Sequence, residues 1–126
     1  MSTRANIIIK DKYDKLYFYR HSDGYPEGAM PTLERFMSWV KEGHIRDNVN
    51  QAAGWLIVIG HQEYEGMCDP TGNWKVGAYE PAIAIHGDIE YLYVLDLEAK
   101  TITIHKGHFD KVDKMITEEI EAGRGM

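Results

Sequence analysis

Cysteine is almost absent from this sequence, because Cys68 is the only one among 126 residues. No internal disulfide can form, and a chain of this length can bury a core without disulfides or a structural metal. We therefore expect one domain spanning residues 1–126, in a reducing compartment. No cationic residue adjoins Cys68 in the sequence, so we do not expect a catalytic thiol.

Long hydrophobic runs are also absent. The longest apolar run, from Trp55 to Ile59, is far shorter than the ~20 residues that a membrane span needs. The charged start from Met1 to Arg4 leads directly into a strand-like segment, unlike an export signal. We expect a cytoplasmic protein without a membrane partner.

Basic residues are scarce. The 14 lysines and arginines face 20 aspartates and glutamates, which gives a net charge of -6. This balance argues against non-specific binding to nucleic acid, which requires many cations that displace counterions from phosphates. Residues 61–99 hold eight carboxylates against Lys75 alone. Such a stretch is usually a solvated surface, and it would also suit docking on a basic partner.

Several common catalytic and nucleotide-binding motifs are missing. The sequence contains no Gly-Lys-Ser/Thr phosphate loop, no Gly-x-Gly-x-x-Gly, no Cys-x-x-Cys and no Gly-x-Ser-x-Gly. Their absence removes the usual signatures of nucleotide hydrolases, dinucleotide enzymes, zinc ribbons and serine hydrolases. The sequence therefore favours a binding protein over an enzyme.

The residues that are present predict alternating strands and helices. A β-branched run and an aromatic run predict a hairpin of residues 6–10 and 16–20. Apolar residues at helical spacing after Pro31 predict a helix over 31–42, closed by Gly43. A second helix over 48–64 is favoured by its length, although residues 55–59 alone would also suit a core strand.

The second half of the chain predicts more strands and a final amphipathic helix. These segments are strands over 74–79, 82–86, 89–97 and 101–105, and a helix over 109–120. The order has no regular βαβ alternation. It predicts an α+β domain with a mostly antiparallel sheet of four to six strands and about three helices on one face.

The loop from Arg20 to Gly28 gathers a cation, an imidazole, a carboxylate and a phenol. Arginine pairs with phosphate or carboxylate groups, and aromatic rings offer rigid contact area and stacking faces. We therefore expect this loop to contact either a host protein or a small nucleotide. The expected binding residues are Arg20, His21, Asp23, Tyr25, Trp74 and Lys75.

Two His-x-Asp triplets supply an alternative hypothesis. His21 and Asp23 form the first and His86 and Asp88 the second, each just after a predicted strand. If these strands are neighbours, the four side chains could hold a divalent metal or act as acid and base in a metal-assisted phosphodiesterase or nuclease. A strand-end carboxylate more often caps its own turn. We therefore commit no residue to catalysis and expect no cofactor.

The Arg20 to Gly28 loop, together with Met1–Arg4, Gln51–Ile57 and Ile85–Tyr91, resembles small proteins carried by phages, prophages and conjugative elements. The resemblance implies a bacterial host cytoplasm and brings no fold or catalytic residue. Such proteins are often accessory factors that blunt host defence, in the manner of anti-CRISPR proteins. They cover a defence protein or sequester its nucleotide signal.

Overall fold

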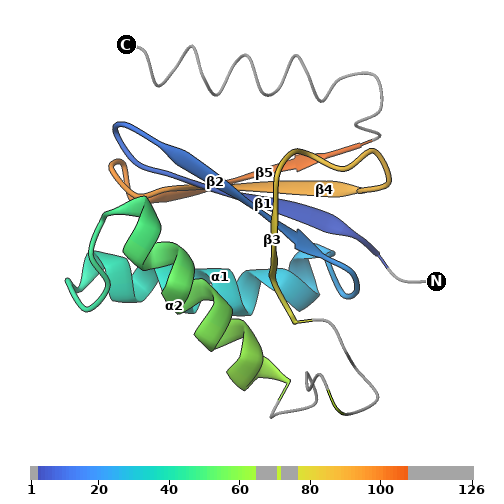
Figure 1. The fold of residues 1–126 in the computed structure, drawn as a ribbon, viewed down its shortest axis with the longest axis horizontal. Helices are drawn as coiled ribbons and strands as arrows, with labels where there is room; N and C mark the ends of the chain where they lie inside the picture. The colour runs from blue at the N-terminus through green and yellow to red at the C-terminus, as the bar shows by residue number, and fades with distance from the viewer. Residues whose placement is uncertain (1–2, 65–70, 72–76, 108–126) are drawn as a thin grey trace.

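The computed structural model of the chain describes residues 3–64, 71 and 77–107 (Figure 1). Five strands form one sheet in the order β3-β2-β1-β4-β5. The elements are β1 (Ala5–Lys10), β2 (Lys15–Arg20), α1 (Pro26–Lys41), α2 (Val49–Glu63), β3 (Glu80–Ala82), β4 (Tyr91–Asp96) and β5 (Thr101–Lys106). The predicted α+β class is confirmed.

The first hairpin forms where the sequence predicts it. β1 pairs with β2 antiparallel, and the Asp11 side chain accepts hydrogen bonds from the backbone N–H groups of Tyr13 and Asp14 in the turn. The other oxygen of Asp11 accepts from the N–H of Val49, at the start of α2, over 2.9 Å. One carboxylate thus closes the hairpin turn and fastens a helix beside it.

β1 is the central strand, and its sequence suits that place. Ile7, Ile8 and Ile9 are all fully buried, as expected for a β-branched run covered on both faces. β4 lies parallel to β1, and the other three strand pairings are antiparallel. The sheet is therefore mostly antiparallel, as predicted, with one parallel pair at its centre.

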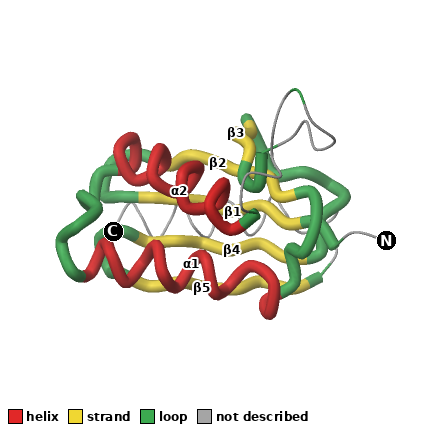
Figure 2. The backbone as a smooth tube through the Cα atoms, turned by 90° about the horizontal axis from the view of Figure 1, so that it is seen from below, coloured by secondary structure: helices red, strands yellow, loops and turns green. Residues whose placement is uncertain are grey.

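Both helices cover the same face of the sheet. Figure 2 shows α1 over β4 and β5, and α2 over β1 and β2. The main core lies between these layers and includes Ile7, Phe18, Phe36, Leu56 and Tyr93. A smaller buried cluster lies on the opposite face of the sheet.

The helix starting at residue 31 in the prediction begins earlier, at Pro26. Pro26 occupies the first turn, where a missing N–H costs nothing, and Pro31 lies inside the helix. The prediction placed the helix start at Pro31, whereas Pro26 is the proline of the first turn. The helix ends before Gly43, whose φ of 82° suits glycine.

The second helix is confirmed, and residues 55–59 are helical rather than a core strand. The side chain of Asn48 caps it by accepting from the backbone N–H groups of Asn50 and Gln51. Within the described residues, no helix combines the length and apolar character that crossing a membrane requires.

The strand predicted over 82–86 is wrong beyond its first residue. β3 ends at Ala82, and residues 83–86 form a bend and an irregular segment. Pro81 lacks the N–H that a longer ladder needs, which confines this segment to a short edge strand. Residues 77–79 are not a strand either. Positions 74–76 and the helix over 109–120 lie outside the described residues.

We expect alanine substitutions at two glycines of α2 to have opposite effects on stability. A Cβ at Gly60 would lie 2.4 Å from the Tyr79 ring, whereas a Cβ at Gly54 would meet nothing within 4 Å. We expect Gly60→Ala to lower the free energy of unfolding by about 1–3 kcal/mol through overpacking. Gly54→Ala should raise it by about 0.5–1 kcal/mol because alanine favours helix. Urea unfolding of both variants measures this, and equal effects would contradict the packing of α2 on Tyr79.

Candidate functional site

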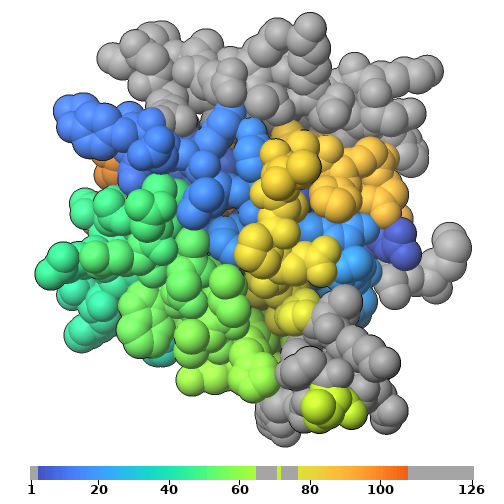
Figure 3. Space-filling view, in the orientation of Figure 1, coloured from blue at the N-terminus to red at the C-terminus, as the bar shows by residue number. Residues whose placement is uncertain are grey.

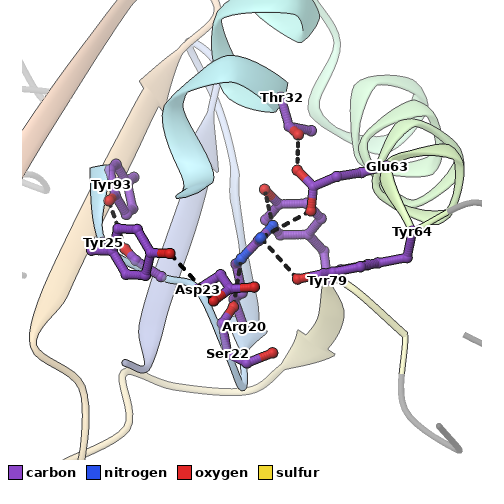
Figure 4. A network of polar contacts seen from close by, with 10 residues as sticks. Arg20, Ser22, Asp23, Tyr25, Thr32, Glu63, Tyr64, Tyr79 and Tyr93 are labelled. Atoms are coloured by element: carbon purple, nitrogen blue, oxygen red, sulfur yellow. Dashed lines mark hydrogen bonds and ion pairs between the residues drawn. The ribbon is translucent and has the colours of Figure 1, made fainter. Parts of the chain in front are cut away.

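β2 ends in Arg20, whose guanidinium is buried, with 2% of the residue exposed. Its Nε donates to the carbonyl of Ser22 (2.8 Å), its Nη1 to the Tyr79 hydroxyl (2.7 Å) and its Nη2 to the Tyr64 hydroxyl (2.9 Å). Nη2 also lies 2.9 Å from Oε2 of Glu63. Figure 4 shows these groups surrounding the arginine. The buried cation thus has three hydrogen-bond acceptors and one carboxylate partner.

The surrounding rings and charges keep Arg20 charged. Its guanidinium lies 5.0 Å from the centroid of the Tyr79 ring and 5.5 Å from that of Tyr64. Burial alone would lower the pKa of Arg20, but Tyr79, the Glu63 carboxylate and Tyr64 together raise it above its ordinary value. Burial also raises the pKa of both tyrosines, so they remain neutral phenols.

Glu63 connects this cluster to the other helix, α1. It is the last residue of α2, and its other oxygen accepts a hydrogen bond from the Thr32 hydroxyl on α1. The Arg20 cluster (Arg20, Glu63, Tyr64, Tyr79 and Thr32) therefore joins β2, both helices and the segment before β3. It fixes the relative position of elements that lie far apart in the sequence.

A hollow of about 450 Å³ opens beside the Arg20 cluster. α1, the end of α2 and the loop after β2 all contribute to its walls. Its lining includes Arg20, Asp23, Tyr25, Arg35, Glu63 and Tyr64. We call this hollow the helix-side pocket.

The loop after β2 has a tightly constrained path to the rim of this pocket. Asp23 has a φ of 55°, a left-handed conformation that aspartate adopts more readily than most residues. A Cβ at Gly28 would lie 2.4 Å from the Asp23 carbonyl oxygen. The Tyr93 hydroxyl donates to the Gly24 carbonyl over 2.6 Å. These contacts hold Asp23 and Tyr25 against the start of α1.

Two charged side chains of the pocket are not used by the fold. Arg35 is exposed on α1 and forms no ion pair with any residue that the structure describes. Asp23 has one long contact, 3.5 Å from the Tyr25 hydroxyl. Arg20 and Glu63, by contrast, neutralise each other. The pocket therefore offers one cation and one carboxylate to a ligand.

A second cluster lies around Tyr19, on the opposite side of β2. The His21 ring meets the Tyr19 ring edge-on at 4.5 Å, and the His86 ring stacks on it at 4.0 Å. The Tyr19 hydroxyl and Nη1 of Arg4 both donate to the same oxygen of Asp88, at 2.8 and 2.6 Å. These contacts fasten the start of the chain and the 83–90 loop to the sheet.

The two His-x-Asp triplets meet only in part. His21, His86 and Asp88 all contact Tyr19 or its hydroxyl, whereas Asp23 lines the helix-side pocket. The described chain contains no group of three or more His, Cys, Asp or Glu residues placed to hold a metal ion. The predicted four-residue centre is therefore not formed.

Successive side chains of a β-strand point to opposite faces of the sheet, which explains this separation. Tyr19 faces away from the helices and Arg20 faces toward them, so the loop that follows divides its side chains between two sides of the sheet. Burial alone would raise the pKa of Asp88, but the hydrogen bonds from Arg4 and Tyr19 outweigh it and lower that pKa. Asp88 is thus a carboxylate already committed to the fold.

The predicted binding residues have different positions. Asp23 and Tyr25 line the helix-side pocket, Arg20 forms its base, and His21 turns toward Tyr19 with its Nε2 3.1 Å from Glu80. Trp74 and Lys75 lie outside the described residues.

The sequence analysis missed the other members of the Arg20 cluster and the exposed arginine of the pocket. Those residues are Thr32, Arg35, Glu63, Tyr64 and Tyr79. The only available signal was that an arginine ending an aromatic strand, if buried, requires a carboxylate partner. Nothing in the sequence distinguishes Arg35 from other exposed helix residues.

A comparison of this chain with protein-family models, curated proteins and solved structures finds no match in any of the three. The geometry of the helix-side pocket and the chemistry of its lining therefore carry the functional proposal.

The Arg20 cluster predicts a large loss of stability on truncation. Arg20→Ala leaves the Glu63 carboxylate and two phenols without their donor, and breaking a buried ion pair costs about 3–5 kcal/mol. Arg46→Ala, at an exposed arginine, should change the free energy of unfolding by less than about 0.5 kcal/mol. Chemical denaturation measures both, and a loss below about 1 kcal/mol for Arg20→Ala would contradict the structural role.

The buried phenol of Tyr19 should make the folded protein less stable at alkaline pH. Burial, aided by the hydrogen bond to Asp88, raises the pKa of Tyr19 from 10.0 to about 12. A raised pKa favours the neutral phenol in the folded state, so its stabilisation is complete below pH 10 and is lost as the pH rises toward 12. Tyr19→Phe should reduce the slope of stability against pH in this window by up to about 1.4 kcal/mol per pH unit. Tyr13→Phe, at an exposed ring, should not, and equal slopes in wild type and Tyr19→Phe would refute the assignment.

Proposed function

We propose that the protein is a non-enzymatic binding protein whose helix-side pocket takes a small nucleotide. The observation that carries this proposal is the set of unused recognition groups in one hollow of about 450 Å³, namely Arg35, Asp23 and the Tyr25 ring. Small-ligand sites typically have volumes of about 300–1,000 Å³. A concave site of this size supports a small ligand better than a flat protein surface.

Each group of the pocket suits one part of a nucleotide. The Arg35 guanidinium can donate two parallel hydrogen bonds to a phosphate. The Tyr25 ring, 38% exposed, offers a face for a base, and such stacking contributes about 1–3 kcal/mol per base. The Asp23 carboxylate can accept from a ribose hydroxyl or a base amino group.

The pocket supports binding rather than catalysis. The Thr32 hydroxyl donates to Glu63, and Glu63 is paired with Arg20. These contacts occupy both the Thr32 hydroxyl and the Glu63 carboxylate, so this pair is not available as the nucleophile and base that nucleophilic catalysis requires. Arg20 acts here by fixing the base of the pocket.

The resemblance to proteins of phages and other mobile elements supplies the biological setting of the proposal. A protein in that setting would act against host defence by sequestering a nucleotide signal in the bacterial cytoplasm. The alternative, covering a host defence protein, would not require the concave site.

Isothermal titration calorimetry with 5′-nucleoside monophosphates and cyclic dinucleotides tests the proposed function. We expect at least one of these nucleotides to bind, and Arg35→Gln to weaken its binding at least tenfold, which corresponds to about 1.4 kcal/mol. Tyr25→Ala should weaken it by a similar factor through the lost stacking. Arg46→Gln is the matched control, because this exposed arginine lies outside the pocket lining. No binding of any nucleotide, or equal binding by Arg35→Gln, would overturn the proposal.

A further inference from the structure

The carboxylate of Asp23 is not used by the fold. Asp23 is exposed, and the Tyr25 hydroxyl, 3.5 Å from Oδ1, is the only polar contact of its side chain among the residues that the structure describes. This distance exceeds the roughly 2.5–3.0 Å of an ordinary O–H···O hydrogen bond. Figure 3 shows part of the blue segment after β2 on the molecular surface, beside the yellow β3. Both carboxylate oxygens are therefore open to hydrogen-bond donors of a ligand.

The position of Asp23 beside the Tyr25 ring decides which part of a nucleotide it meets. Under the proposed function, on which this inference rests, the base stacks on the Tyr25 ring. The phenol oxygen lies at the tip of that ring, and Oδ1 of Asp23 lies beyond it (Figure 4). A base stacked on the ring is parallel to it, so the edge of the base can extend past the phenol oxygen to the carboxylate. Asp23 is thus placed to contact the base rather than the ribose.

We propose that Asp23 makes the helix-side pocket selective for guanine. An ionised carboxylate offers two acceptor oxygens side by side and no donor. Among the common RNA bases, guanine alone presents two neighbouring N–H donors on one edge, namely N1–H and the 2-amino group. Each oxygen of Asp23 can accept from one of them.

The other bases place an acceptor against the carboxylate. Adenine and cytosine each have an amino group next to an unprotonated ring nitrogen, and uracil has a single N–H between two carbonyls. One carboxylate oxygen would then face a lone pair instead of a donor. Because an unpaired polar group at a recognition site costs binding energy, these bases are disfavoured.

The backbone at Asp23 allows an isosteric test. Its φ is 55°, a left-handed conformation that asparagine adopts about as readily as aspartate. Asp23→Asn therefore keeps the shape of the loop and exchanges one acceptor for an NH₂ donor. Xanthine matches that exchange, because it keeps the N1–H of guanine and has a carbonyl in place of the 2-amino group.

Isothermal titration calorimetry with GMP, IMP, AMP, CMP and UMP measures the selectivity of the wild-type chain. GMP should bind about tenfold more tightly than AMP, CMP or UMP. IMP, which lacks only the 2-amino group of GMP, should bind more weakly than GMP. If monophosphates do not bind and cyclic dinucleotides do, cyclic di-GMP should exceed cyclic di-AMP by a similar factor.

The Asp23→Asn variant separates recognition from a structural effect. It should weaken GMP binding about tenfold and strengthen binding of xanthosine monophosphate by a similar factor. A substitution that only disturbed the loop would weaken both. Asp47→Asn is the matched control, since this exposed aspartate lies outside the pocket lining, and it should change neither affinity.

The outcomes distinguish this inference from the proposed function. Nucleotide binding without a preference for guanine would overturn the inference alone, as would loss of GMP binding by Asp23→Asn without a gain for xanthosine monophosphate. Equal binding of GMP and AMP, with weaker binding of 2′-deoxy-GMP, would assign Asp23 to the ribose instead. If no nucleotide binds, the proposed function fails as well.

Discussion

The buried guanidinium of Arg20 is the constraint on which the rest of this structure depends. A buried cation is costly unless its donors are paired, and here Tyr64, Tyr79 and the Ser22 carbonyl accept hydrogen bonds from it while Glu63 forms an ion pair with it. These partners come from distant parts of the chain. The polar contacts of Arg20 can therefore form only when the sheet and both helices are assembled. Burial of this arginine thus disfavours partly folded or misfolded states.

The residues of the Arg20 cluster that line the pocket stabilise the fold, whereas other lining residues remain open to a ligand. Arg20 and Glu63 neutralise each other and form a fixed base, so under the proposed function a ligand would contact Asp23, Tyr25 and Arg35. Preorganised groups lose little entropy when a ligand binds. The left-handed Asp23 and the close contact at Gly28 supply that order on the loop side. The pocket is thus rigid at its base and polar at its rim.

Much of the fold could be predicted from the sequence, because local patterns determined it. The hairpin, the capped second helix and the final hairpin follow from β-branched runs, helical spacing and Asn48. The parallel pairing of β1 with β4 was not predictable in this way, because it depends on contacts across the whole chain. The start of α1 was misplaced since two prolines satisfy the same rule.

The candidate site was predicted less well for a physical reason. A loop rich in polar residues can be recognised in a sequence, but the direction of each side chain depends on which face of the sheet it leaves. Asp23 and His21 are neighbours in sequence and lie in different clusters. The partners of Arg20 come from other elements, and no spacing rule connects them to it.

The hydrogen-exchange rates of the arginine Nε–H groups, measured by NMR at neutral pH, test the account most directly. Arg20 donates its Nε–H to the Ser22 carbonyl inside the fold, so its proton should exchange far more slowly than those of Arg35 and Arg46. It should do so before any ligand is added. An Arg20 Nε–H that exchanges as fast as the surface arginines would contradict the buried cluster, and with it the pocket that the cluster positions.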